Sequence, residues 1–203
     1  MYQLPSLKYL YQDLEPFIDT HTMSLHYEKH TKNYLNKLNS LLEKHNYNYK
    51  YSLTELVYHL DEFDKTIRED ILFNLGGILN HILYFNNMSK NPEKPMGKFK
   101  LELERIFSSY DNFVNLFKKK ALEVKGSGYT FLVLNKNKQL EIINTKDQIT
   151  PLSFGFIPLF NVDLWEHAYY LNYENERNRY LDNFFQVADY KIINQFFNNS
   201  TNN

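Results

Sequence analysis

The chain has 203 residues, of which 43% are hydrophobic and 23% are charged, and its formal net charge is −1. This length and composition fit a soluble globular protein of one sizeable domain or two small lobes, and the near-neutral charge argues against nucleic acid or an anionic membrane as a partner. The chain contains no cysteine, which excludes disulfides, thiolate metal sites and cysteine nucleophiles.

The N-terminal segment has no basic stretch followed by an apolar one, so we expect no signal peptide. No uncharged apolar run approaches the length that crosses a membrane. The lack of cysteine fits a reducing compartment. We therefore expect a soluble, cytoplasmic protein without a membrane partner.

The first half of the chain has a helical pattern. Asp19 or Thr20 can cap a helix over 20–43, and the capping-box spacing of Ser52 and Glu55 predicts a short helix ending near Leu60. A third helix is expected over 66–88. The segment NPEKPMG then breaks the pattern, which predicts a boundary between a domain over residues 1–90 and one over 91–203.

The second half mixes helical and strand patterns. In chain order we expect a helical stretch over 98–118, a hairpin of strands over 129–135 and 139–145, a third strand over 156–163, helical stretches over 165–170 and 182–197, and a frayed tail NNSTNN. A helical half followed by this mixture indicates an α+β fold.

Histidine and aspartate give the clearest chemical signal. His26 and His30 are four residues apart on the first predicted helix and so share a face. His81 lies in an apolar helix, and Asp163 and His167 are again four residues apart. One carboxylate with two or three imidazoles is typical of a non-haem iron or manganese centre, but zinc uses the same atoms. The remaining histidines carry no such signal and are expected to be ordinary surface residues: His21, His45 and His59.

Several segments around these residues resemble the iron/manganese superoxide dismutase family over nearly the whole chain. They are LPSLKYLYQDLEPFID, TMSLHYEKHTKNYLNKLN, NLGGILNHILYF, GSGYTFLVLNKNKQL and DLWEHAYY. The last is the most specific, because it is similar to the family signature D-x-W-E-H-A-Y-Y. The resemblance implies an N-terminal helical hairpin domain packed on a C-terminal α/β domain with a three-stranded antiparallel sheet.

The resemblance also implies the activity and the site. The enzyme would convert superoxide to O2 and H2O2 at one manganese or iron ion per subunit, by alternate reduction and reoxidation of the metal. Tyr34 and His30 would line the substrate gateway and relay protons. The implied metal ligands are His26, His81, Asp163 and His167.

A homodimer is implied as well. In this family the residues matching Glu166 and Tyr170 reach across the dimer interface, where Glu166 would orient the partner's His167 and Tyr170 would bond to the partner's His30. Arg177 resembles an arginine that draws superoxide toward the site. A solvated carboxylate and an ordinary surface charge are the alternatives for Glu166 and Arg177.

Two positions bear on the choice of metal. Iron enzymes of the family usually carry a glutamine four residues before the second ligand histidine, where this chain has Gly77. Manganese enzymes usually supply it from the C-terminal domain, at the position of Gln148. The resemblance therefore favours manganese, with a cambialistic manganese/iron enzyme as the alternative.

The chain departs from the family at several positions near the site. Asn161 lies two residues before Asp163 and is unusual, and Asn178 replaces a proline after Arg177. Five aromatic residues stand where tryptophan is usual, which keeps the apolar surface and is expected to lose indole hydrogen bonds: Phe85, Tyr129, Phe131, Phe185 and Tyr190.

Two other classes of protein were weighed. An inactive metal-binding relative would keep the ligands without turnover, but all four ligands and both gateway residues are present. A dioxygenase with two histidines and a carboxylate needs open positions on its metal for oxygen and substrate. The third histidine closes one of these positions, so the sequence favours a dismutase.

Overall fold

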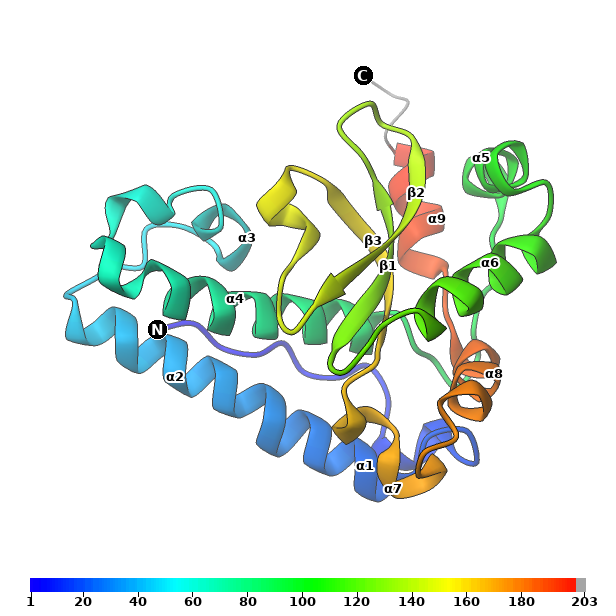
Figure 1. Cartoon of the computed structure of the whole chain (residues 1–203), viewed down its shortest axis with the longest axis horizontal. Helices are drawn as coiled ribbons and strands as arrows, with labels where there is room; N and C mark the ends of the chain where they lie inside the picture. The colour runs from blue at the N-terminus through cyan, green and yellow to red at the C-terminus, as the bar shows by residue number, and fades with distance from the viewer. Residues whose placement is uncertain (200–203) are drawn as a thin grey trace.

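The structure is a computed structural model that describes residues 1–199. Its helical N-terminal half lies against a C-terminal half in which helices surround a small sheet (Figure 1). This is the α+β architecture expected from the sequence, with a helical hairpin followed by a three-stranded antiparallel sheet. The predicted fraying of NNSTNN concerns mainly residues 200–203, which lie outside the described part of the chain.

The N-terminal half is a hairpin of two long helical segments. Their facing apolar side chains, among them Leu38, Leu42 and Leu75, are buried between α2 and α4. In chain order the half contains η1 (Tyr11–Leu14), α1 (Thr20–Leu25), a π-helical turn η2 (His26–Thr31), α2 (Lys32–Lys44), α3 (Leu53–Leu56), η3 (Leu60–Glu62) and α4 (Lys65–Asn86).

The caps of these helices agree with the sequence. The Asp19 carboxylate accepts a hydrogen bond from the backbone N–H of Thr22 at 2.8 Å and so begins α1. Ser52 and Glu55 form the expected capping box. The short helix ends sooner than predicted, at Leu56, and the chain continues as a turn and the 3-10 segment η3.

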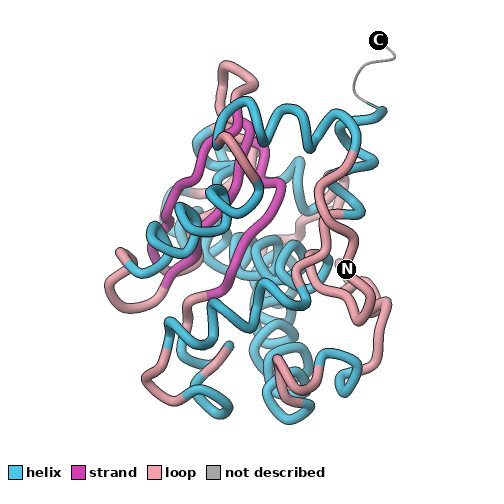
Figure 2. Tube along the Cα trace, turned by 90° about the vertical axis from the view of Figure 1, so that its right-hand side faces the viewer, coloured by secondary structure: helices cyan, strands magenta, loops and turns pink. Residues whose placement is uncertain are grey.

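The C-terminal half places strand β1 at the centre of its sheet. The strand order is β2-β1-β3, and both pairings are antiparallel; Figure 2 shows the three strands lying side by side among helices. The elements are α5 (Gly97–Phe107), α6 (Tyr110–Leu122), β1 (Gly128–Leu134), β2 (Leu140–Lys146), η4 (Pro151–Phe154), β3 (Ile157–Asp163), η5 (Glu166–Ala168), α7 (Tyr170–Tyr173), α8 (Arg177–Val187) and α9 (Lys191–Asn199).

Two predicted helical stretches are each divided in the structure. The stretch over 98–118 breaks at Ser108, whose φ of 71° lies in the left-handed region, and Ser109 caps the next helix. The stretch over 182–197 breaks at Ala188, which is extended and forms an isolated β-bridge with Met88. The apolar periodicity of the sequence continues through both positions, so it does not predict that the helices end there.

Helix α4 links the two halves. Its first turns contribute Ile71, Leu75 and Ile78 to the core of the hairpin, while Tyr84 and Phe85 belong to the large aromatic core of the C-terminal half. The helix therefore packs against both halves, and the middle of α4 lies where they meet.

Candidate metal centre

Four side chains from distant parts of the chain meet at this junction. His26, His81, Asp163 and His167 each bring one ligand atom into a group whose members all lie within 4.8 Å of one another. The first three side chains are fully buried, and the side chain of His167 is 12% exposed. The sequence-predicted ligand set is therefore brought together in space.

His26 is presented by the π-helical turn η2, which interrupts the single helix expected over 20–43. The Thr31 hydroxyl donates to the His26 carbonyl at 2.8 Å, five residues earlier, inside the widened turn. Such π-turns are rare within helices and often occur at functional sites. His26 is buried, while His30 is half-buried at its edge.

Asp163 is the last residue of β3 and lies next to β1. The Asp163 Oδ1 atom accepts a hydrogen bond from the backbone N–H of Trp165 at 2.8 Å. The Oδ2 atom lies 3.1 Å from His26 Nε2, 3.5 Å from His167 Nε2 and 3.6 Å from His81 Nε2. One oxygen is thus held by the backbone, and the other faces all three imidazoles.

His81 shows that the group suits a metal ion. Its Nδ1–H donates to the Gly77 carbonyl, one helical turn earlier on α4, at 2.5 Å. The opposite nitrogen, Nε2, then carries a lone pair, is buried, and has no hydrogen-bond partner within residues 1–199; the same holds for His167 Nε2. Buried polar atoms without a partner are costly. Two of them beside a carboxylate oxygen match a cation with imidazole and carboxylate ligands.

The surroundings of His26, His81 and Asp163 favour the unprotonated forms of these three side chains. Burial lowers the pKa of His26 to about 4 and lowers the pKa of His81 well below its usual value. Burial would raise the pKa of Asp163, but the neighbouring imidazoles of His167 and His26 outweigh this effect and lower that pKa. Neutral imidazoles and an ionised carboxylate are the forms that bind metals.

A hydrogen-bonded chain lies beside the cluster. The Tyr129 hydroxyl donates to Gln148 Oε1 at 3.0 Å, and Gln148 Nε2 donates to the Tyr34 hydroxyl at 3.0 Å. The Tyr129 oxygen is also 3.4 Å from Nδ1 of His81. Burial raises the pKa of both tyrosines, so both hydroxyls keep their protons near neutral pH.

The hydroxyl of Tyr129 corrects one expectation from the sequence. Replacing tryptophan by tyrosine here does not remove a hydrogen-bond donor, because the phenol supplies one of its own to Gln148. The other four aromatic residues keep apolar packing, as expected. The ring centroid of Phe85 lies 5.1 Å from that of His26, and the ring centroid of Phe131 lies 5.8 Å from that of Tyr129. Phe185 and Tyr190 lie in the core around Phe160.

Gly77 leaves room for Tyr34. A Cβ atom on Gly77 would lie 2.7 Å from two carbons of the Tyr34 ring, which is well inside van der Waals contact. Any side chain at position 77 therefore requires the ring of Tyr34 to move. The residue that the family resemblance links to metal choice is therefore in contact with Tyr34.

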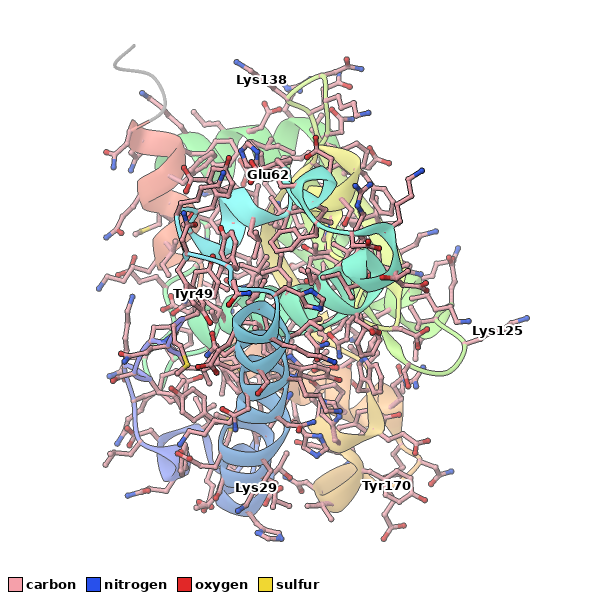
Figure 3. All side chains as sticks on the ribbon, turned by 90° about the vertical axis from the view of Figure 1, so that its left-hand side faces the viewer. Lys29, Tyr49, Glu62, Lys125, Lys138 and Tyr170 are labelled. Atoms are coloured by element: carbon pink, nitrogen blue, oxygen red, sulfur yellow. The ribbon has the colours of Figure 1, made fainter. Side chains whose placement is uncertain are left out.

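The residues predicted at a dimer interface lie on the surface of this chain. Glu166 is exposed, Tyr170 is 47% exposed, and His30 stacks on His167 with ring centroids 4.1 Å apart. Figure 3 shows Tyr170 at the outer edge of the molecule, at the same end as Lys29. Trp165 lies between Asp163 and His167, and its indole N–H donates to the Asp147 carbonyl at 3.2 Å.

Arg177 is bound to the backbone of the protein. Its guanidinium donates to the carbonyls of Val124, Gly126 and Leu164 at 2.8, 3.2 and 3.2 Å, and its Nε–H donates to the Tyr169 hydroxyl at 3.1 Å. It therefore ties the loop before β1 to the segment that follows Asp163. Its neighbour Asn178 is exposed.

Sequence reasoning missed Asn80, which precedes His81 on α4. Its amide donates to the carbonyls of Gln148 and Ile149 at 3.2 and 3.4 Å, and its own carbonyl accepts from the amide of Asn161 at 2.9 Å. A buried asparagine inside an apolar helix was the available signal, because its amide needs partners. The pattern alone could not name them, since they come from other parts of the chain.

Known proteins resemble this chain over nearly its whole length. Residues 1–89 match the family model for the alpha-hairpin domain of iron/manganese superoxide dismutases, and residues 95–196 match the model for the C-terminal domain. The chain is 40% identical over 197 residues to the superoxide dismutase [Mn] of Listeria innocua, with 97% of each chain covered. It is 37% identical over 196 residues to superoxide dismutase [Mn/Fe] 2 of two Staphylococcus aureus strains, again with 97% of each covered.

The two matched domains and these full-length relatives define the class. The chain belongs to the iron/manganese superoxide dismutase family. Within the described residues, no helix is both long enough and apolar enough to span a membrane.

Proposed function

We propose that this protein is a superoxide dismutase that uses one manganese or iron ion per subunit. The observation that carries the proposal is the buried cluster of one carboxylate oxygen and three imidazole nitrogens, two of which have no hydrogen-bond partner in the described chain. The proposed ligands are His26, His81, Asp163 and His167. The relatives named superoxide dismutase support the same activity.

The bound ion would supply one-electron redox chemistry, by which one superoxide is oxidised to O2 and a second, with two protons, is reduced to H2O2. The chain's own residues hold the ligand atoms in their metal-binding forms. The Gly77 carbonyl fixes the tautomer of His81, and the Trp165 backbone N–H fixes the orientation of the Asp163 carboxylate. Such contacts behind the ligands tune a metal site.

Proton delivery would use the tyrosine and glutamine chain. The Tyr34 hydroxyl accepts a hydrogen bond from Gln148, and the residue Tyr34 is 9% exposed. Tyr34 therefore lies between the buried site and the surface. Burial raises the pKa of Tyr34, so its hydroxyl carries a proton at neutral pH that it can donate. His30, half-buried and stacked on His167, is the second proposed gateway residue.

Manganese is the first choice of metal, and a cambialistic enzyme is the alternative. The pairing of Gly77 with Gln148 supports manganese, as does the name of the Listeria relative. The Mn/Fe names of the Staphylococcus relatives support the alternative. In a Gly77→Gln variant, Tyr34 must move, and we expect the ratio of manganese-loaded to iron-loaded activity to fall.

We further propose a cytoplasmic homodimer. The exposed positions of Glu166 and Tyr170, close to the half-buried His30, leave these side chains free to meet a second copy. Glu166 would then contact the partner's His167, and Tyr170 the partner's His30. Arg177 is proposed to add positive charge near the entrance while it holds the backbone.

The direct test is superoxide consumption by purified protein loaded separately with manganese and with iron. We expect rapid dismutation with manganese. High activity with iron and none with manganese would overturn the metal assignment. Bound metal with no superoxide consumption by either form would instead identify an inactive metal-binding relative.

A further inference from the structure

The loop that carries Gln148 packs closely against the backbone of helix α4 at Gly76, which has no side chain. A Cβ atom on Gly76 would lie 2.0 Å from the Gln148 carbonyl oxygen and 3.2 Å from its carbonyl carbon. The obstacle is backbone, which cannot rotate away as a flexible side chain can. Only a glycine at position 76 allows the loop to approach the helix this closely.

The next turn of the helix holds the same loop by hydrogen bonds. Asn80 follows Gly76 by four residues, so the two share a face of α4. The Asn80 amide donates to the carbonyls of Gln148 and Ile149, and Asn80 and Gln148 are each 1% exposed. Buried carbonyls need such partners. Gly76 thus provides the space, and Asn80 provides the attachment.

The neighbouring face of the same helix turn serves the candidate metal centre. Gly77 contacts the ring of Tyr34, and its carbonyl accepts from His81. Consecutive positions on α4 therefore fix the backbone of Gln148 on one side and Tyr34 and His81 on the other. The Gln148–Tyr34 hydrogen bond of 3.0 Å joins these two sides.

We propose that Gly76 and Asn80 are positioning residues that set how closely Gln148 approaches the metal centre, and that they thereby influence which metal supports activity. This inference rests on the proposed dismutase function. Gly76 acts through the Gln148 backbone, which holds the atoms nearest to a Cβ placed at position 76. Hydrogen-bonding groups behind the ligands typically change metal affinity or activity about 10- to 100-fold, so a displaced glutamine has a measurable effect.

The experiment compares Gly76→Ala and Asn80→Ala with the unaltered protein, each loaded with manganese and with iron. Asn74→Ala is the matched control, because within residues 1–199 the Asn74 amide donates to the Asp70 carbonyl of its own helix and not to the Gln148 loop. The readouts are the midpoint potential and visible absorption spectrum of the manganese form, and the ratio of manganese to iron activity. Alanine favours helix more than glycine does, so any loss at position 76 reflects the loop.

We expect both variants to shift the potential and the spectrum and to change the activity ratio about tenfold, with Asn74→Ala unchanged in all three. Unaltered potential, spectrum and ratio in both variants would overturn the inference, whatever their thermal stability. If Gly76→Ala does not fold, Asn80→Ala alone decides in the same way. An unaltered protein inactive with both metals would refute the proposed function, and the spectrum would still test the position of Gln148.

Discussion

The Tyr129 hydroxyl donates a hydrogen bond of 3.0 Å to the side-chain oxygen of Gln148, and this contact determines which way the amide faces. With Oε1 held by a donor, the Nε2 end must point toward Tyr34, to which it donates. Tyr129 lies in the central strand β1, while Gln148 lies in the loop after β2. The strand therefore orients a side chain of the loop beside the candidate metal centre.

Replacement of Tyr129 by phenylalanine tests this contact. The ring remains, but the buried Gln148 oxygen loses its donor, which costs about 1–3 kcal/mol of unfolding free energy. The amide is then free to turn, so we also expect slower dismutation and an altered visible spectrum of the manganese-loaded protein. Urea unfolding and the absorption spectrum measure the two effects.

Tyr2→Phe is the matched control for this variant, because it removes a hydroxyl bonded to the Tyr51 carbonyl at the far end of the hairpin. We expect it to change stability without changing the spectrum. A spectrum unaltered in Tyr129→Phe would show that the hydroxyl does not orient the amide. Tyr129→Trp restores an N–H donor and should recover part of the spectrum.

The sequence predicted much of the fold because local chemistry determined it. The Asp19 and Ser52 caps, the apolar faces of α2 and α4, and the β-branched runs of the hairpin are each set by neighbouring residues. The breaks at Ser108 and Ala188 depend instead on a left-handed residue and on a bridge to Met88. Periodicity does not report such contacts.

The candidate site was predicted unevenly for a similar reason. Residue types and four-residue spacings are local, so the sequence itself drew attention to His26 with His30 and to Asp163 with His167. The resemblance to the family then selected the ligands among the histidines. Gly76 contacts the Gln148 carbonyl, and the Asn80 amide donates to the same carbonyl. Both contacts join residues about 70 positions apart in the sequence. Without a matching local pattern, only the folded structure brings them together.

Asp163→Asn tests the metal cluster itself. The amide keeps the shape of the side chain but removes the anionic oxygen that faces the three imidazoles. We expect metal affinity to fall at least as far as the roughly 10- to 100-fold typical of losing a contact behind a ligand. Metal analysis after dialysis measures this.

Asp182→Asn is the control for that variant, because this exposed carboxylate pairs with Lys118 on the surface. It should retain its metal. Full metal content in Asp163→Asn would contradict the assignment of the aspartate as a ligand.

Removal of the metal should make stability depend on pH. In the metal-free protein, burial lowers the pKa of His26 from 6.5 to about 4. Between these values the unfolded chain binds a proton that the folded chain does not. The contribution of His26 to the free energy of unfolding is therefore fully present above pH 6.5 and is lost as the pH falls toward 4. At about 1.4 kcal/mol per pKa unit, the total loss is about 3 kcal/mol from this group.

Urea midpoints at pH 7.5 and pH 5 measure the decline. The metal-loaded protein should have a higher midpoint than the metal-free protein at both pH values, because a bound ion stabilises the folded state. It should also lose stability as the pH falls, because protons compete with the ion for the imidazole nitrogens. Equal midpoints for the metal-free protein at the two pH values would contradict the burial of a neutral His26.

Arg177 offers a test that separates support of the backbone from attraction of superoxide. Lysine keeps the charge but cannot form the fork that reaches the carbonyls of Val124, Gly126 and Leu164. We expect Arg177→Lys to lower the free energy of unfolding by at least about 2 kcal/mol, because hydrogen bonds to charged groups are worth about 1.5–3 kcal/mol each.

The control is Arg179→Lys, which alters an exposed ion pair with Glu176 and should cost less than about 1 kcal/mol. If Arg177 also attracts superoxide, Arg177→Lys keeps the dependence of the rate on salt, whereas Arg177→Ala weakens it, since steering of an anion depends on charge and is screened by ions. The same salt dependence of the rate in the unaltered protein, Arg177→Lys and Arg177→Ala would leave Arg177 with a purely structural role. In that role it ties the loop before β1 to the segment after Asp163.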